Sequence, residues 1–248
     1  MQLRQTAAIG RGLQVNASYT WSKSIDTGSS TIAGDQFANS ISSLLFFDSR
    51  RNSGLSDFNI GQTLSLHFTY DFPTPASRGA RWTLVKNWRL SGTYQASTGA
   101  PFTPVLSGDP LGSKSADPYD VPNAVARAGC GNPVNPGRAS GYLKLECFAF
   151  PSPATLFGNL GRNALVGPSL STAGISVFKD NFIKRVSDTL NLQLRFEAFN
   201  LLNHPNLAPP LNHRALFDAS GNAIPGAGLI DATATPSRQM QTGLKIIW

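Results

Sequence analysis

Hydrophobic and polar residues alternate along the last segment of the chain, residues 238–248. Polar residues and a glycine occupy the odd positions from 239 to 245. Four even positions hold apolar side chains, those of Met240, Leu244, Ile246 and Trp248. Because successive side chains of a β-strand point to opposite faces, this pattern predicts a strand with one apolar and one polar face.

The same alternation recurs over unusually long segments elsewhere. From Phe58 to Phe72, every even position except Gln62 is apolar. Soluble strands usually span about 5–6 residues, whereas a tilted membrane strand needs about 9–11. The lengths therefore favour membrane strands. The predicted strands are 1–9, 13–24, 57–72, 87–98, 171–180, 189–200 and 238–248.

The connections between these strands alternate in length. The short ones are 10–12, 73–86 and 181–188, and the long ones are 25–56, 99–170 and 201–237. Outer-membrane barrels have short periplasmic turns and long external loops. We therefore predict an all-β fold, an antiparallel up-and-down meander of about seven long strands. This meander would be the C-terminal part of a transmembrane β-barrel.

The longest loop, 99–170, could contact a ligand or cover the barrel mouth, and we expect it to cover the mouth.

The predicted topology places the C-terminus on the periplasmic side. A terminal strand that ends on an aromatic residue is typical of outer-membrane barrels, whose assembly machinery reads it, although a soluble protein can also end in a strand. We expect a C-terminal assembly signal made of Met240, Leu244, Ile246 and Trp248. The barrel assembly machinery is accordingly an expected partner.

Aromatic residues lie at the ends of the predicted strands. Interfacial girdles of aromatics are expected in barrels because the rings combine an apolar body with a polar edge. The predicted periplasmic girdle contains Tyr70, Phe72, Trp88 and Trp248. The predicted external girdle contains Tyr19, Trp21 and Phe58.

Composition agrees with a barrel. Charged residues make up only 14% of the chain, against about 25% in typical soluble domains. No apolar run reaches the roughly 18 residues of a membrane helix, and a barrel is the other structure that satisfies every backbone group in a bilayer. We therefore expect the cell outer membrane as the location and its lipid as a partner.

The net charge of +7 raises the question of nucleic acid binding. The basic residues are scattered, and the only adjacent pairs are Arg50–Arg51 and Lys184–Arg185. No helix-turn-helix, zinc-finger or RNP-like pattern is present. We expect no nucleic acid partner, and basic loop residues beside anionic lipid headgroups explain the charge better.

The chain has two cysteines, Cys130 and Cys147, both in a loop rich in proline and glycine. In an oxidising compartment they would form a disulfide that closes this loop. The alternative is two unrelated thiols. The disulfide is the favoured interpretation.

The polar strand faces should line the barrel lumen, and the apolar faces should meet lipid. The candidates for lumen lining are His67, Gln95, Arg195 and Glu197. We expect Arg195 and Glu197 to pair with neighbouring residues rather than to act as an acid–base couple.

Signals of catalysis are weak. The histidines His204 and His213 show no metal-ligand spacing, and no nucleotide-binding or nucleophile-elbow motif occurs. The acidic residues Asp26, Asp35 and Asp48 are scattered along one long loop. We therefore predict a protein that is not an enzyme and that uses no cofactor or metal.

Four segments resemble one family. They are N-A-S-Y-T-W-S-K-S-I-D (residues 16–26), F-D-S-R-R-N-S-G-L-S-D-F (47–58), F-G-N-L-G-R-N-A-L-V-G-P (157–168) and R-F-E-A-F-N-L-L-N-H-P-N (195–206). They are similar to the barrel of TonB-dependent receptors, closest to the Oar-like group with a carboxypeptidase-regulatory-like domain. The resemblance covers nearly the whole chain and implies about the last third of a 22-stranded barrel that takes up a ligand across the outer membrane.

The resemblance also implies partners outside this sequence. In that family a plug fills the barrel and TonB supplies energy through an N-terminal region, and neither region has a counterpart in residues 1–248. The first residues contain no apolar core of a signal peptide. We therefore expect a C-terminal fragment whose partners include the remainder of the barrel, the plug, and TonB through the N-terminal region.

Two other classes of function remain open. A surface adhesin or a structural outer-membrane barrel would share these strands but would not transport. A secreted glycan-binding β-sandwich would also show alternating strands, although its strands should be shorter. The ligand cannot be chosen from the sequence.

Overall fold

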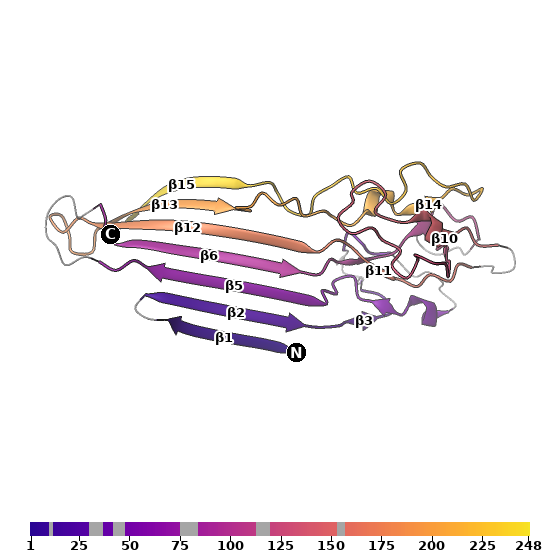
Figure 1. Ribbon diagram of the computed structural model, residues 1–248, viewed down its shortest axis with the longest axis horizontal. Helices are drawn as coiled ribbons and strands as arrows, with labels where there is room; N and C mark the ends of the chain where they lie inside the picture. Colours follow the sequence, from indigo (N-terminus) through magenta and orange to yellow (C-terminus); the bar gives the residue numbers. More distant parts are fainter. Residues whose placement is uncertain (10–11, 30–36, 42–47, 75–83, 113–119, 153–156) are drawn as a thin grey trace.

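Seven long strands form one antiparallel sheet, called the long sheet below (Figure 1). The computed structural model describes residues 1–9, 12–29, 37–41, 48–74, 84–112, 120–152 and 157–248. The strands are β1 (Gln2–Ile9), β2 (Leu13–Trp21), β5 (Gln62–Asp71), β6 (Trp88–Ser97), β12 (Leu170–Phe182), β13 (Asn191–Phe199) and β15 (Gln239–Ile247). The predicted all-β meander is confirmed.

Each long strand pairs with its neighbour in the meander, so the order in the sheet is β1-β2-β5-β6-β12-β13-β15. The strands alternate in direction, and β1 and β15 therefore run the same way at the two edges of the sheet. Since these strands make a single sheet, the β-sandwich alternative does not describe this architecture.

The register keeps one polar and one apolar face across all strands. On the apolar face, Ala17 pairs with Leu66 and Leu66 with Tyr94. On the polar face, Asn16 pairs with His67 and His67 with Thr93. A slip of one residue would move every side chain to the opposite face, so the consistent register preserves the alternation read from the sequence.

Several strand ends differ from the prediction: β2 ends at Trp21 rather than at residue 24, and β5 and β12 differ more. The alternation predicts a strand over 57–72, but β5 begins at Gln62, because Asp57 and Asn59 are buried among the loops. Phe58 therefore lies outside the strand, in a tilted ring contact with Phe37 whose centroids are 5.6 Å apart. In contrast, β12 exceeds the predicted 171–180 and has 13 residues.

The long loops pack together at one end of the long sheet (Figure 1). We call this part the loop cap, made of the described residues of a first loop (22–61), a second loop (98–169) and a third loop (200–238). It contains eight short strands that the sequence pattern does not predict: β3 (Ile25–Asp26), β4 (Gly54–Leu55), β7 (Pro101–Phe102), β8 (Val105–Leu106), β9 (Asn123–Ala124), β10 (Phe148–Ala149), β11 (Leu165–Val166) and β14 (Ala215–Phe217). Three short 3₁₀ helices accompany them: η1 (Ser49–Asn52), η2 (Leu145–Cys147) and η3 (Leu211–His213).

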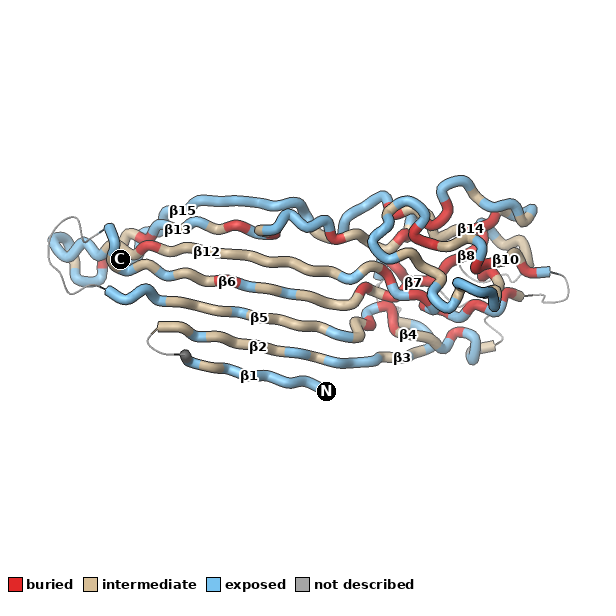
Figure 2. The backbone as a smooth tube through the Cα atoms, in the orientation of Figure 1, coloured by how far each residue is buried: buried red, intermediate tan, exposed pale blue. Residues whose placement is uncertain are grey.

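The hydrophobic core of the described residues lies in the loop cap rather than in the sheet. Figure 2 shows the buried residues gathered among the loops, while the long strands are half-buried or exposed. Phe102, Leu106 and Leu216 have no exposed surface. The parallel pairing of β8 with β14 joins the second and third loops around this core.

Among the described residues no helix is both long and apolar enough to span a bilayer. The predicted loop residue Asp35 and parts of the predicted connections 10–12 and 73–86 lie outside the described residues.

Candidate functional site

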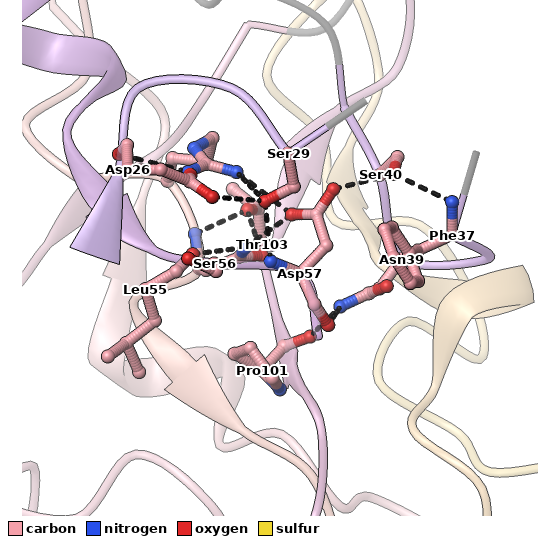
Figure 3. A network of polar contacts seen from close by, with 12 residues as sticks. Asp26, Ser29, Phe37, Asn39, Ser40, Leu55, Ser56, Asp57, Pro101 and Thr103 are labelled. Atoms are coloured by element: carbon pink, nitrogen blue, oxygen red, sulfur yellow. Dashed lines mark hydrogen bonds and ion pairs between the residues drawn. The ribbon is translucent and has the colours of Figure 1, made fainter. Parts of the chain in front are cut away.

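A buried charge network joins the first and second loops around Arg162 (Figure 3). Only 1% of the Arg162 side chain is exposed. Its guanidinium donates to the carboxylate of Asp57 over 2.9 Å, and a second nitrogen donates to the carboxylate of Asp26. The remaining Nε donates to the carbonyl oxygen of Asn52 at 2.9 Å. The cation is therefore fully paired inside the loop cap.

Asn163, the next residue, extends the network. Its backbone N–H donates to the Thr103 hydroxyl at 2.8 Å. Its side-chain amide donates to the carbonyl of Leu55 at 2.7 Å and to Asp57 at 2.6 Å. Asn163 has a φ of 52°, a conformation that asparagine tolerates better than most residues. One short motif of the second loop is therefore fixed against the first loop.

Asn39 links the network to β7. Its amide donates to the carbonyl oxygen of Asp57 at 2.9 Å and to that of Pro101 at 2.6 Å, and Figure 3 shows it between the two. At Gly54 a Cβ would collide with the carbonyl oxygen of Arg162. Glycine is therefore required where the two loops cross.

The environment of Asp26 favours its charged form. Burial raises its pKa, but hydrogen bonds from Ser56 and Ser29 and the charge of Arg162 together lower it below the ordinary 3.8. A buried arginine needs such paired carboxylates because an uncompensated charge in the interior is strongly unfavourable.

An asparagine-rich turn fastens the third loop to the strand ends. Asn206 is fully buried, accepts the N–H of Ser171 at 2.7 Å and donates to the carbonyl of Ser171 at 3.0 Å. Asn200 and Asn203 adopt φ of 47° and 51°. Asn203 accepts the N–H of Arg238 just before β15. This turn ties together the loop-cap ends of β12, β13 and β15.

Cys130 and Cys147 form a disulfide within the second loop, with sulfur atoms 2.03 Å apart. Cys147 belongs to the hydrophobic core cluster. Nearby, Tyr142 donates its hydroxyl to the carbonyl of Val166, and burial raises its pKa to about 12. The tyrosine is therefore a neutral donor at physiological pH.

Two cavities of the loop cap are lined by described residues. The larger, about 840 Å³, lies between the second and third loops and is lined by Tyr142, Val134, Leu207, His204 and several prolines. The smaller, about 320 Å³, lies between the first and second loops. Both volumes fall in or near the range of about 300–1,000 Å³ that is usual for small-molecule sites.

The four candidates for lumen lining all lie on the polar face of the long sheet. His67 pairs with Thr93, and Gln95 lies two residues further along β6. Arg195 donates to Gln193 at 2.6 Å, and Glu197 accepts from Gln241 at 2.7 Å. They are spread over β5, β6 and β13 and do not converge on one point. Arg195 and Glu197 are hydrogen-bonded to neighbouring residues instead.

The residues of the expected assembly signal lie on β15, at one edge of the sheet, and just after it. Each has more than half of its surface exposed, namely Met240, Leu244, Ile246 and Trp248. Around Met240, β12, β13 and β15 form a shallow, mainly apolar groove of about 260 Å³ on the apolar face.

The sequence pattern does not predict the Arg162 network. It leaves Asp26 as one of several scattered loop carboxylates, whereas the structure joins Asp26 and Asp57 through Arg162, more than a hundred residues away. One feature of the sequence points to these residues. Asp26, Asp57 and Arg162 all lie inside the segments that resemble one family. In the structure His213 lies 3.3 Å from Asp231, and no group of metal-ligating side chains occurs within the described residues.

Comparison with known proteins supports the topology. A family model described as "Outer membrane beta barrel domain" matches residues 1–241. No curated protein and no solved structure matches the chain. The match spans every long strand, β15 included up to Gln241, together with the whole loop cap. The chain therefore belongs to the outer membrane beta barrel domain family, and its location is the outer membrane.

Proposed function

We propose that this chain is the C-terminal barrel wall and external loop region of a TonB-dependent receptor that takes up a ligand across the outer membrane. The observation that carries the proposal is the combination of a two-faced long sheet with a packed loop cap at one end. A wall needs an apolar face for lipid and a polar face for an aqueous interior. A receptor also needs an ordered external surface that a ligand can contact.

The edges of the long sheet support a larger barrel. Within the described residues, β1 and β15 each pair with one strand only, and unpaired edges are not tolerated in hydrocarbon. Because β1 and β15 run in the same direction, pairing them with each other would be parallel. An odd number of additional strands would close the sheet into an all-antiparallel barrel.

In this proposal the polar face, including His67, Gln95, Arg195 and Glu197, contacts the lumen and the plug. The loop cap contacts the ligand and covers part of the barrel mouth. Energy comes from TonB through an N-terminal region, and the chain itself performs no catalytic step.

An uptake assay in the native cell tests the proposal. Cells with the intact gene and cells lacking it would be compared for uptake of a labelled siderophore, cobalamin, an oligosaccharide and a peptide, with and without a protonophore. The expected result is loss of energised uptake of one of these ligands in the deletion strain. Unchanged uptake of all ligands, with reduced cell adhesion, would instead support the adhesin alternative.

A further inference from the structure

The smaller cavity of the loop cap, about 320 Å³, combines a cationic side with an apolar side. Arg50 and Arg51 provide the cationic side, and Phe157 and Leu160 are part of the apolar side. We infer that this cavity binds an anionic group, a phosphate or a carboxylate, carried on an apolar body. The inference does not depend on ligand uptake.

The two arginines differ in how their charges are used. Arg51 donates to the carbonyl oxygen of Gly158 at 2.9 Å and lies 3.8 Å from the carboxylate of Asp48. The guanidinium of Arg50 makes no hydrogen bond and no ion pair within the described chain. Arg50 is exposed and lines the cavity. Arg51 is thus held in place, while Arg50 keeps its planar set of donors available for an anion.

The helix η1 places these side chains next to each other. Asp48 caps η1 by accepting the backbone N–H of Arg50 at 3.2 Å. Arginine recognises carboxylate and phosphate through two parallel hydrogen bonds, which are stronger than bonds between neutral groups. The available guanidinium of Arg50, with Arg51 lining the same cavity, therefore suits one anionic group.

The opposite side of the cavity is rigid. Residues 157–161 come directly before Arg162, whose buried contacts fix the end of this segment. Asn159 accepts the N–H of Ala124 at 2.7 Å and donates its own N–H to Asn123 at 2.9 Å. At Gly158 a Cβ would collide with the carbonyl of Val121. The cavity is therefore bounded by backbone held in one position, which favours a preformed site.

The charge of Arg50 favours an anion in the cavity, since Asp48 lies beside Arg51 and not beside the Arg50 guanidinium in any ion pair of the described residues. The lining residues of the cavity include two arginines and one aspartate, Asp120. Asp120 is 4% exposed, and its carboxylate accepts the N–H of Leu111 at 2.8 Å, so its charge is partly compensated within the second loop. A molecule of liquid water occupies about 30 Å³, so the cavity has room for a phosphate and a ring-sized body.

An anionic group on an apolar body has two sources at a cell surface. One is the phosphate group of a lipid in the outer leaflet, and the other is a soluble anionic compound. Titration calorimetry on the intact protein, purified from membranes in detergent, would use phenyl phosphate as the probe and benzyl alcohol as its neutral analogue. Lipid A in mixed micelles would then be added as a competitor.

Removal of one charge should weaken binding of phenyl phosphate. We expect Arg50→Gln to lower the affinity about tenfold or more, because a charge-assisted pair is lost. The matched control is Arg185→Gln, which removes an exposed arginine from the turn after β12, at the other end of the molecule, and should leave the affinity unchanged.

A second variant fills the cavity without removing charge. Gly161 has no positive φ, and a Cβ there would meet no atom within 4 Å, so Gly161→Leu is compatible with the fold and should block phenyl phosphate. Competition by lipid A would support a lipid phosphate, and binding without competition would support a soluble anion. The inference is overturned if phenyl phosphate does not bind, if benzyl alcohol binds equally well, or if Arg50→Gln has no effect. A negative uptake assay would leave these outcomes unchanged.

Discussion

At the residue scale, the loop cap depends on one buried cation and its carboxylates. We predict that Asp57→Ala destabilises the cap by about 3–5 kcal/mol, because it leaves the charge of Arg162 partly uncompensated in the interior. The measurement is the urea dependence of cap proteolysis in isolated outer membranes. Asp71→Ala is the control, since Asp71 forms an exposed pair with Arg89 and such pairs contribute about 0–1 kcal/mol. Equal effects of the two variants would contradict this role of Arg162.

The same network should make the stability of the loop cap depend on pH in the acid range. The pKa of Asp26 is lowered in the folded state, so the stability it contributes is present above its unfolded value of 3.8. That stability is lost as the pH falls through the lower folded pKa. We predict that the urea concentration needed to unfold the cap falls as the pH drops below 3.8. Asp26→Asn should make the cap more sensitive already at neutral pH and flatten this dependence, and an unaltered pH profile in that variant would argue against Asp26.

Single residues show where the sequence is informative and where it is not. Gln62 breaks the alternation in residues 57–72, and β5 begins at this residue. Asp57 fits the alternation but is recruited by Arg162, which lies 105 residues further along the chain. Local periodicity carries no information about such a contact. The predicted strand is therefore too long at its start, where Asp57 belongs to the network.

At the element scale, the two faces of a strand should respond differently to charge. We predict that Leu66→Arg, on the apolar face of β5, costs about 2–4 kcal/mol if it lies near the middle of the bilayer. Ser65→Arg adds the same charge on the polar face of the same strand and should cost little. Heat-modifiable gel mobility after extraction from membranes would report the folded fraction. If Ser65→Arg is the more harmful of the two, the assignment of the faces is wrong.

The long strands are predictable because each repeats a period of two over 8–13 residues. The strands of the loop cap have two or three residues, which is too short for any period to appear. Their positions follow from tertiary contacts, such as the pairing of Ala215 with Val105. The smaller cavity of the loop cap also depends on tertiary contacts, so it cannot be predicted from the sequence. Only the adjacent pair Arg50–Arg51 can be recognised there.

At the scale of the whole molecule, the terminal residue should control assembly. We predict that deletion of Trp248 reduces the amount of folded protein in the outer membrane several-fold, because the aromatic residue that follows β15 is part of the expected assembly signal. Trp248 is 77% exposed, so its removal leaves the packing of the described residues nearly unchanged. Quantitative immunoblotting of outer-membrane fractions measures the effect. The comparison is Leu3→Ala, a change of an exposed apolar residue on the opposite edge strand β1. Equal losses in the two variants would mean that Trp248 has no special role.

The loop cap has its own hydrophobic core, a disulfide and a buried ion network. Its outer surface is therefore a fixed shape rather than a set of independent peptides. A bacteriophage or an antibody that approaches the cell would meet residues from all three loops held side by side. Binders raised against the folded protein should recognise conformational epitopes, and linear peptides copied from single loops should be poor substitutes for this surface.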